Sequence, residues 1–222
     1  MRYYPVYLDL NDRVVLVVGG GAIAEGKAVQ LVEAGARVRL VSPDLTPHLA
    51  ELAARGQIEY RRGEFKSDDL RGVVLVIGAT SDQAVNEVVA RLAAERGVLH
   101  NVVDQPRLCD FITPALVTRG GLQISVSTAG SSPSVAQRVK REIGELIGDE
   151  YGELLEVAAE MRAEAKRQIP DFEARRQVLH AFVESQAIEL LRTRNREKAR
   201  KLAFDLLQRA VGTGSGRDLD SM

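Results

Sequence analysis

The sequence has a single cysteine and almost no net charge, and both facts exclude whole classes of protein. One cysteine, Cys109, rules out an internal disulfide framework and a zinc site built on cysteines. Thirty Lys and Arg residues balance 31 Asp and Glu residues, which leaves a formal net charge of −1. A protein whose main task is to coat nucleic acid usually has a basic excess, so we do not expect that task here.

The sequence also has no long apolar run. No segment approaches the roughly 20 apolar residues that a membrane-spanning helix needs. The first ten residues, MRYYPVYLDL, lack the charged and apolar regions of a secretory signal. The hydrophobic fraction of 45% is ordinary for a globular chain with a core. We therefore expect a soluble, cytoplasmic enzyme or ligand-sensing protein.

Glycine is scarce in the last third of the chain. Fifteen of the 19 glycines lie at or before Gly148, and only Gly152 falls between Tyr151 and Val211. The glycines of the first part are typical of the turns between alternating strands and helices. Their near absence from the second part predicts helices that follow one another almost directly. Residues 212–222 are rich in Gly and Ser and are expected to be a disordered tail.

Strands and helices are expected to alternate up to residue 103. The expected strands cover residues 13–18, 37–41, 58–61, 73–77 and 98–103, and the expected helices cover residues 22–34, 47–55 and, after a cap at Ser81, up to about residue 96. Buried β-branched strands linked mostly by helices predict a parallel sheet with helices on both faces.

The alternation ends at a loop over residues 104–114. Residues 122–127 then alternate between apolar and polar and predict a half-exposed antiparallel strand. Ser132 and the proline after it predict the start of a helix. Its apolar positions keep helical spacing: Val135, Val139, Ile143 and Leu146. Three further amphipathic helices are expected, over residues 154–165, 178–191 and 199–210.

The segment VVLVVGGGAIAEGK (residues 14–27) carries the strongest chemical signal. Gly19, Gly21 and Ala24 fit the G-x-G-x-x-A pattern between a buried strand and a helix. Gly19 permits a tight turn, Gly21 lets a pyrophosphate approach the backbone, and Ala24 allows close packing of helix on sheet. Backbone N–H groups at the helix start, Ala22 and Ile23, then bind phosphate with help from the helix dipole. The pattern predicts a dinucleotide site, but glycines also serve plain turns.

The choice between NAD and NADP is expected at the end of the second strand, at Ser42, Pro43 and Asp44. No Lys or Arg occupies this stretch to pair with a 2′-phosphate, and Asp44 would repel one, so NAD is favoured. Asp44 has an alternative role as the cap of the next helix. Ala79 and Thr80, after the fourth strand, mark either a place where the cofactor passes or an ordinary turn.

Asp104 follows the fifth strand, at the carboxyl edge where open α/β sheets bind ligands. A carboxylate of ordinary acidity is ionised at neutral pH and can accept a proton. Asp104 is therefore a candidate general base, and it could equally begin a turn before Pro106.

Three stretches occur in order along the chain: GGGAIAEGK, NVVDQPRLCDFITPA (residues 101–115) and SVSTAGSSPSVAQRVKREI (residues 125–143). Together they resemble the precorrin-2 dehydrogenase family, which includes the N-terminal part of multifunctional siroheme synthases. The resemblance implies NAD-dependent oxidation of precorrin-2 to sirohydrochlorin and, in some relatives, Fe²⁺ insertion to give siroheme. Because the chain ends without the methyltransferase domain of the longer siroheme synthases, we expect a stand-alone form.

The resemblance also implies roles for single residues and for parts of the chain. Asp104 matches the family's catalytic aspartate. The segment from Ser127 to Gly130 lies where relatives often carry two serines, and Thr128 keeps a hydroxyl there. A homodimer is implied. The expected parts are a Rossmann-type NAD-binding domain at residues 1–114, an α+β dimerisation region at 115–149 and an all-α domain at 150–211.

The implied substrate has eight carboxylate arms, so a cleft that receives it should present cations and amides. The candidates are Asn101, Arg107, Arg119, Thr128, Ser132, Arg138, Lys140 and Arg141. Each charged candidate is otherwise a solvated surface charge, and Ser132 is otherwise only a helix cap.

No spacing of residues predicts a preformed metal site. His48, His100 and His180 are far apart in the sequence, and strand alternation also allows His100 to be packed. Cys109 is a soft metal ligand in principle, whereas a lone cysteine is usually a small buried apolar residue. Inserted Fe²⁺ would be held by the tetrapyrrole itself.

A function of another class stays open. The regulatory domains of potassium transport systems sense nucleotides with a similar fold, and fold alone does not decide function. Residues 101–143 argue against this reading, because a sensor has no reason to carry them.

Overall fold

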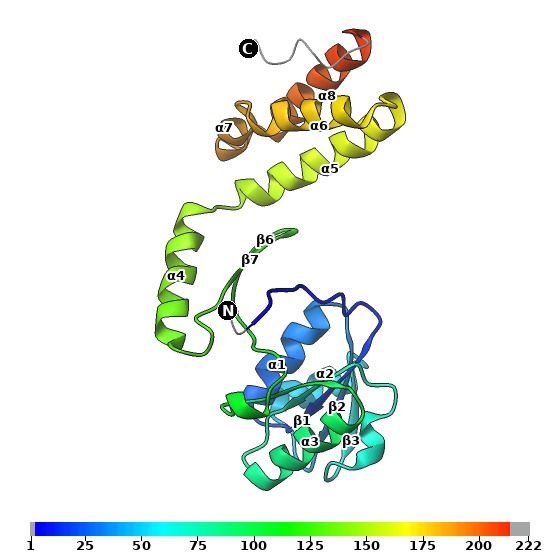
Figure 1. The fold of residues 1–222 in the computed structure, drawn as a ribbon, viewed down its shortest axis with the longest axis vertical. Coiled ribbons are helices and arrows are strands. Elements are labelled where there is room, and N and C mark those ends of the chain that lie inside the picture. Colours follow the sequence, from blue (N-terminus) through cyan, green and yellow to red (C-terminus); the bar gives the residue numbers. More distant parts are fainter. Residues whose placement is uncertain (1–2, 214–222) are drawn as a thin grey trace. The chain divides into compact units, whose positions relative to one another are not determined.

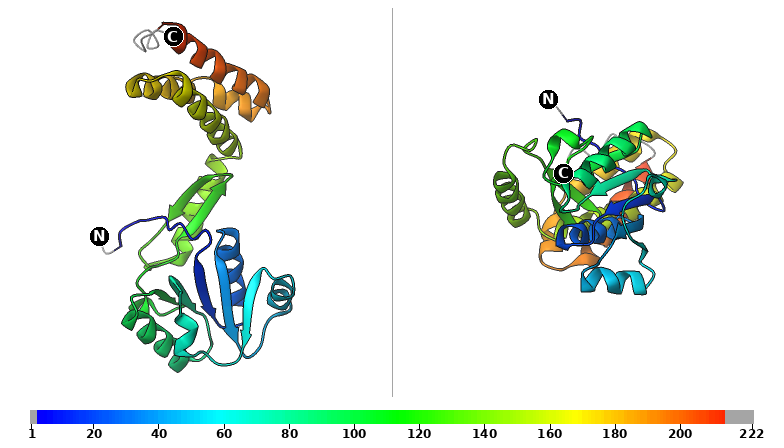
Figure 2. Two further views of the ribbon diagram at one scale, coloured as in Figure 1. Left: turned by 90° about the vertical axis from the view of Figure 1, so that its right-hand side faces the viewer. Right: turned by 90° about the horizontal axis from the view of Figure 1, so that it is seen from below.

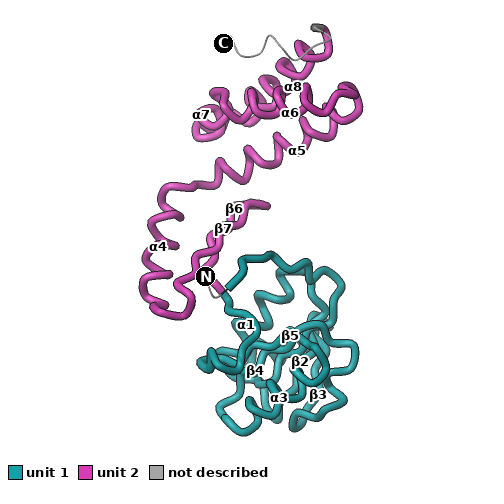
Figure 3. Tube along the Cα trace, viewed as in Figure 1, with its two compact units in different colours: residues 1–113 teal, residues 114–222 magenta. Residues whose placement is uncertain are grey.

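The computed structural model describes residues 3–213. The chain divides into two compact units, residues 1–113 and 114–222, which Figure 3 colours teal and magenta. The division falls between Thr113 and Pro114, next to the boundary after residue 114 that the sequence predicts.

Unit 1 (residues 1–113) is built on a parallel sheet. Its strands are β1 (Val14–Val18), β2 (Arg37–Ser42), β3 (Ile58–Arg62), β4 (Leu75–Gly78) and β5 (Leu99–Val102), in the spatial order β3-β2-β1-β4-β5. Every pairing between these neighbours is parallel. The predicted strands and the predicted parallel sheet are confirmed. The order reverses between β1 and β4, and open α/β sheets bind ligands at such a point.

Helices cover both faces of this sheet (Figures 1 and 2). They are α1 (Ala22–Glu33), α2 (Pro47–Ala54) and α3 (Gln83–Glu95), with short 3₁₀ turns η1 (Ser67–Leu70) and η2 (Pro106–Leu108). Val15 and Val17 of β1 pack with α1 and α2, whereas Leu16 and Val18 pack with α3. Successive side chains of a strand point to opposite faces, so a strand buried on both faces is apolar throughout.

The cap of α3 differs from the prediction. The sequence places it at Ser81, but the carboxylate of Asp82 accepts hydrogen bonds from the N–H groups of Ala84 (2.8 Å) and Val85 (3.3 Å). The prediction of Ser81 was therefore wrong by one position. Because Ser and Asp are about equally favoured as capping residues, the residue types alone do not decide between Ser81 and Asp82.

Unit 2 (residues 114–222) begins with a hairpin and a helix. Strands β6 (Ala115–Arg119) and β7 (Leu122–Val126) pair antiparallel, and α4 (Pro133–Leu146) follows. Strand β7 and the cap of α4 at Ser132 are confirmed. The sequence analysis missed β6. The Gly120–Gly121 dipeptide between two short strands is a common hairpin turn and is the signal that would have found it.

The rest of unit 2 is helical, and Figures 1 and 2 show its helices packed on one another. They are α5 (Glu150–Gln168), α6 (Phe172–Val183), α7 (Ala187–Arg192) and α8 (Arg196–Thr213). Met161, Phe182 and Leu207 lie fully buried in their common core. The single helix predicted over residues 178–191 is wrong. Two helices, α6 and α7, occupy it, because the step of six residues between the apolar Phe182 and Ile188 fits no helical repeat.

Helix α8 continues to Thr213, so it includes the first two residues of the predicted disordered tail. The remainder of that tail lies outside the described residues. Among the helices of residues 3–213, none combines the length and apolar character that a membrane crossing needs.

Candidate functional site

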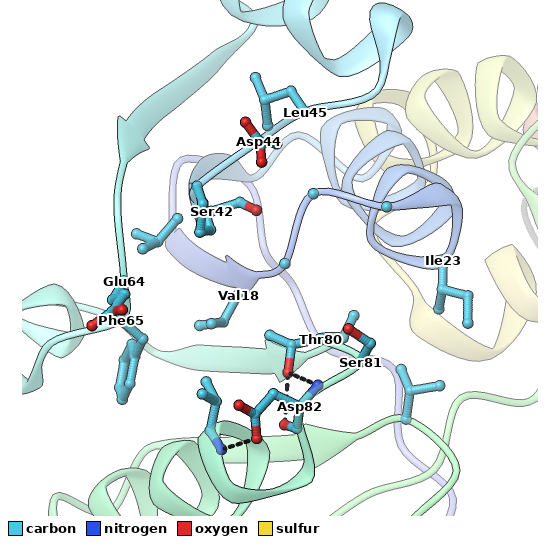
Figure 4. A pocket seen from close by; sticks show the side chains of 18 of the residues that line it. Val18, Ile23, Ser42, Asp44, Leu45, Glu64, Phe65, Thr80, Ser81 and Asp82 are labelled. Atoms are coloured by element: carbon cyan, nitrogen blue, oxygen red, sulfur yellow. Dashed lines mark hydrogen bonds between the residues drawn. The ribbon is translucent and has the colours of Figure 1, made fainter.

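A cavity of about 1110 Å³ opens in unit 1 among the segments that follow the five strands of the sheet (Figure 4). Nine of the ten predicted cofactor residues line it: Gly19, Gly21, Ala22, Ile23, Ser42, Pro43, Asp44, Ala79 and Thr80. The tenth, Ala24, lies in the first turn of α1 and is fully buried against the sheet side of the core, as the predicted close packing of helix on sheet requires. Asp104 lines the same cavity. The structure therefore brings together segments that lie up to 85 positions apart in the sequence, from Gly19 to Asp104.

The glycine loop passes tightly between two neighbouring loops. Gly19 has φ +126°, and a Cβ built on it would lie 2.4 Å from the carbonyl oxygen of Ala79. A Cβ on Gly20 would lie 1.9 Å from the carbonyl oxygen of Asp44. A Cβ on Gly21, in contrast, would meet nothing within 4 Å. The first two glycines are thus required by packing, while the third leaves open space.

That open space lies at the start of α1. Gly21 is the N-cap residue, its backbone is extended (φ −86°, ψ −176°), and no side chain caps the helix. The N–H groups of a first helical turn have no partner within the helix, and the helix dipole adds positive potential there. This cradle fits the pyrophosphate of a dinucleotide.

The end of β2 holds Asp44 beside an arginine that the sequence analysis missed. Nη2 of Arg62 lies 3.7 Å from Oδ1 of Asp44, and its Nε donates a hydrogen bond to the carbonyl of Pro43 (3.1 Å). Arg62 belongs to β3, whose register pairs it with Ser42. The stretch from Ser42 to Asp44 itself contains no basic residue. A residue on the neighbouring strand supplies one.

The alternative role of Asp44 as a helix cap is also wrong. The Oγ1 of Thr46 accepts the N–H of Leu49 (3.3 Å) and caps α2. Oγ1 of Thr46 also donates a hydrogen bond to the Glu25 carboxylate of α1. Asp44 is left with its side chain 90% exposed.

The turn after β4 is held by Asn86, a buried residue of α3 that the sequence analysis did not single out. Nδ2 of Asn86 donates to the carbonyl of Thr80 (3.0 Å), and its Oδ1 accepts from the Thr80 hydroxyl (3.0 Å) and N–H (3.3 Å). The Thr80 hydroxyl also lies 2.9 Å from the carbonyl of Asp82 (Figure 4). The cavity wall at Ala79 and Thr80 is thereby fixed.

Apolar side chains line several parts of the cavity. Phe65 follows β3, Val85 and Val88 lie on α3, and Leu45 lies next to Asp44, away from Phe65 (Figure 4 labels Phe65 and Leu45). These side chains offer flat apolar surface of the kind that a base of a dinucleotide needs. Phe65 follows the short, partly buried strand β3, and nothing in the local sequence marks it as part of a site.

Asp104 lies in a tight turn at the rim of the cavity. The N–H of Gln105 donates to the carbonyl of Val102 (3.2 Å), and the backbone of Asp104 has φ +60°. This left-handed conformation is uncommon for residues other than glycine, and Asp is among those that tolerate it best. Asp104 thus occupies a turn, as one interpretation expected, and lines the cavity, as its role as a general base requires.

The base of the loop that carries Asp104 is clamped to β5. Nδ1 of His100 lies 2.7 Å from Oδ2 of Asp110, and Nδ2 of Asn101 donates to the carbonyl of Phe111 (2.9 Å). Sγ of Cys109 lies 3.2 Å from both the N–H and the carbonyl of Val102. His100 and Asn101 are buried. Asn101, a predicted substrate residue, does not line the cavity and acts here as a clamp.

The predicted site residues of unit 2 make local contacts. The Thr128 hydroxyl donates to the carbonyl of Ser132 (3.0 Å) and accepts its N–H (3.2 Å), and Oγ of Ser132 accepts the N–H of Val135 (3.3 Å). Arg138 pairs with Glu142 one turn along α4 (2.8 Å). Thr128 and Ser132 therefore shape the entry to α4.

Arg119 is structural. Its Nε donates to the carbonyl of Ile147 (2.9 Å), and its Nη2 donates to the carbonyl of Gly144 (2.8 Å). These carbonyls end α4 and have no partner within the helix, so Arg119 is committed to capping rather than to a ligand.

The histidines are separate in the fold as in the sequence. His48 lies on α2 near Glu51 (3.9 Å), His100 lies on β5 and His180 lies on α6. Within residues 3–213, no three His, Cys, Asp or Glu side chains gather in a way that could hold a metal ion.

The sheet order, the glycine loop and the cavity at the switch point define a Rossmann-type dinucleotide-binding domain. A family model described as "Putative NAD(P)-binding" matches residues 6–115, one described as "Sirohaem biosynthesis protein central" matches residues 119–146, and one described as "Sirohaem synthase dimerisation region" matches residues 150–208. The chain belongs to the family formed by the N-terminal part of siroheme synthases and by precorrin-2 dehydrogenases.

Individual relatives agree with this assignment. The siroheme synthase of Thioalkalivibrio sulfidiphilus is 42% identical over 214 residues, which are 96% of this chain and 43% of that protein. The siroheme synthase of Methylococcus capsulatus is 38% identical over 211 residues, 95% of this chain and 44% of that protein. The chain thus spans less than half the length of these curated relatives.

A solved structure described as SirC, precorrin-2 dehydrogenase, is similar with a TM-score of 0.77 and 26% identity. The match covers 93% of this chain and 100% of that one. These relatives give no support to the alternative of a potassium-transport regulatory domain. The dimerisation description falls on residues 150–208, whereas the sequence analysis places that region at residues 115–149.

Proposed function

We propose that the chain is a nicotinamide-dependent dehydrogenase that oxidises precorrin-2 to sirohydrochlorin. The observation that carries this proposal is that the glycine loop and Asp104 line one cavity, in a family that includes a solved precorrin-2 dehydrogenase. The oxidation removes a hydride and a proton from the substrate, so it needs a hydride acceptor and a base at one place.

The chain's residues divide this work. The open start of α1 at Gly21 holds the pyrophosphate of the cofactor on backbone N–H groups. When bound, the nicotinamide ring supplies the hydride acceptor. The carboxylate of Asp104 accepts the second hydrogen, which leaves the substrate as a proton. The contact between His100 and Asp110 keeps the Asp104 turn in place.

We propose NAD rather than NADP as the cofactor. Asp44 lines the cavity at the end of β2 with its carboxylate exposed. A carboxylate at this place accepts hydrogen bonds from the ribose hydroxyls of NAD and repels the 2′-phosphate of NADP. Arg62, which lies beside Asp44, is held by that carboxylate and by the carbonyl of Pro43.

Fe²⁺ insertion is a second reaction that the family resemblance implies. It removes two protons from the ring nitrogens of sirohydrochlorin, and we propose that the same carboxylate, Asp104, accepts them in turn. Fe²⁺ is a substrate in this reaction, to be held by those nitrogens as it enters. Incubation of purified sirohydrochlorin with Fe²⁺, with and without the protein, tests this step by the appearance of the siroheme spectrum.

We propose that the functional form is a homodimer. Helix α4 presents Val135, 50% exposed, and Leu146, 73% exposed, on the stripe that also carries Val139 and Ile143. Apolar stripes of this kind mark surfaces that bind another protein. The dimerisation description in the family supports a second copy of the chain as the partner, and it falls on residues 150–208, after α4.

Absorbance tests the proposed oxidation directly. Precorrin-2 and NAD⁺ are mixed with the folded protein, and the spectra of sirohydrochlorin and NADH are expected to appear together in equal amounts. Folded protein that binds NAD⁺ and produces neither spectrum would refute the proposal.

A further inference from the structure

A second cavity, of about 510 Å³, adjoins the cofactor cavity and shares Asp104 with it. Gln83 and Glu87 of α3 form one side, and the loop from Asp104 to Leu108 forms the other. A group placed here would lie beside the proposed general base and outside the cofactor site.

The loop that forms this cavity is held in shape. The N–H of Leu108 donates to the carbonyl of Gln105 (2.9 Å), Sγ of Cys109 lies 3.2 Å from the same carbonyl, and Pro106 begins the turn η2. Arg107 therefore projects from a fixed turn. A pre-organised group loses less conformational entropy when it binds a ligand.

Arg107 is unusual among the arginines of unit 1 because its guanidinium is unengaged. Eight of the described arginines in this unit contact a carboxylate, carbonyl or hydroxyl: Arg37, Arg39, Arg55, Arg61, Arg62, Arg71, Arg91 and Arg96. Within residues 3–113, no contact of this kind engages the side chain of Arg107 or of Arg13. Arg13 stands just before β1, at the opposite end of the sheet from the cavities.

The charges of the second cavity give Arg107 a definite role. Glu87 already accepts a hydrogen bond from Gln83 (2.9 Å), and Asp104 lines both cavities. A carboxylate that entered would be repelled by both acids, so it needs a cation at contact distance. Among the residues that line this cavity, Arg107 is the one that supplies it.

We propose that Arg107 binds a carboxylate arm of the macrocyclic substrate in this second cavity and so sets the ring beside Asp104. This inference rests on the proposed oxidation of precorrin-2. A guanidinium donates two parallel hydrogen bonds to a carboxylate, which fixes the direction of the arm as well as its position.

The test is a titration of the full chain with sirohydrochlorin, followed by absorbance without added nucleotide. Arg107→Ala is expected to raise the Kd about tenfold or more, since a hydrogen bond between charged groups has this worth. Arg107→Lys should recover part of the loss, because Lys keeps the charge but not the paired geometry. In turnover, kcat/KM for precorrin-2 should fall, because the variant loses both substrate affinity and the placement of the ring, while the Kd of NAD⁺ stays unchanged.

The matched control is Arg13→Ala, which removes the other unengaged arginine far from the cavities and should leave the Kd unchanged. Added salt should weaken binding by the wild-type chain more than binding by Arg107→Ala. Equal Kd values for wild type, Arg107→Ala and Arg13→Ala would overturn the assignment while leaving the oxidation standing. A wild-type chain that neither binds sirohydrochlorin nor oxidises precorrin-2 would overturn both.

Discussion

The guanidinium of Arg62 lies 3.7 Å from the carboxylate of Asp44, where β2 and β3 end side by side. Both side chains are largely exposed, 78% for Arg62 and 90% for Asp44. An ion pair this exposed contributes little to stability. The pair lies at the edge of the cofactor cavity, so it bears on the choice of cofactor. Asp44 favours NAD, whereas a free Arg62 would favour the 2′-phosphate of NADP.

Asp44→Ala should shift the cofactor preference toward NADP. The substitution removes the acceptor for the ribose hydroxyls and the repulsion of a 2′-phosphate, and it releases Arg62 to pair with that phosphate. We expect the ratio of the two Kd values to change by about tenfold or more, the worth of one hydrogen bond between charged groups. Fluorescence titrations with NADH and NADPH measure the ratio.

The control for this prediction is Arg62→Ala. It should leave NADH binding nearly unchanged and weaken any NADPH binding, and the double variant should bind NADPH more weakly than Asp44→Ala alone. An unchanged ratio in Asp44→Ala would remove Asp44 from cofactor selection.

Gly21→Asp should block the cofactor without harming the fold. A Cβ at Gly21 meets nothing within 4 Å, and Asp is a preferred residue at the N-cap position that Gly21 occupies. The new carboxylate would take the helix N–H groups that the pyrophosphate needs and would repel it. Thermal melts should show undiminished stability, and titration should show the loss of NADH binding.

Two further glycine variants distinguish the effect of the added charge from the effect of the added side-chain volume. Gly21→Ser caps the helix without charge and should lose less affinity than Gly21→Asp. Gly20→Ala should instead lower the stability, because its Cβ would lie 1.9 Å from the carbonyl oxygen of Asp44. Normal NADH binding by Gly21→Asp would contradict the proposed pyrophosphate position.

The strands of unit 1 could be predicted because burial on both faces leaves a plain signal. Val14–Val18 is apolar at every position, and the glycine loop follows it directly. The hairpin strand β6 was missed because residues 115–119 mix apolar and polar side chains over only five positions. A short strand of this kind forms because it pairs with its partner strand, here β7, and its own sequence pattern is too weak to predict it.

The site residues that the sequence did not reveal are those placed by distant pairing. Arg62 reaches Asp44 only through the register of β2 with β3. Asn86 resembles any polar residue of a helix until the fold buries it against Thr80. Asn101 was singled out for the substrate, but its side chain is used to hold Phe111. Such roles follow from tertiary contacts that local pattern does not contain.

Asp104→Asn should abolish most turnover while leaving cofactor binding intact. Asn matches Asp in size and tolerates the same left-handed backbone, so the φ of +60° is kept and only the base is lost. A general base contributes about 10²- to 10⁴-fold in rate, and kcat should fall by that order. Turnover comparable to wild type in this variant would exclude Asp104 as the base.

Leu146→Glu should weaken the proposed dimer. Leu146 is 73% exposed at the end of the apolar stripe of α4, and a charge there would have to be desolvated on association. Light scattering after size exclusion measures the mass. Phe172→Glu is the matched variant, since Phe172 is 71% exposed at the start of α6, within the part of the chain described as the dimerisation region. If only one of the two substitutions dissociates the dimer, the interface lies at the helix that carries it. A dimer unaffected by Leu146→Glu would exclude the apolar stripe of α4 as the interface.

Cys109 should react slowly with alkylating reagents in the folded protein. Burial raises the pKa of its thiol, and the thiolate is the reactive form, so less of it is present at pH 8 than in an unfolded chain. Iodoacetamide labelling followed by mass spectrometry measures the rate, and because Cys109 is the single cysteine of the sequence, the signal is unambiguous. The raised pKa also makes the free energy of unfolding depend on pH. The unfolded chain loses the thiol proton at a lower pH than the folded chain. The stabilisation that Cys109 contributes is therefore complete below the pKa of the unfolded chain and is lost as the pH rises through the pKa of the folded chain. Equal labelling rates in buffer and in denaturant at pH 8 would show that the thiol is not shielded, and the clamp between Cys109 and Val102 would then not hold the Asp104 loop.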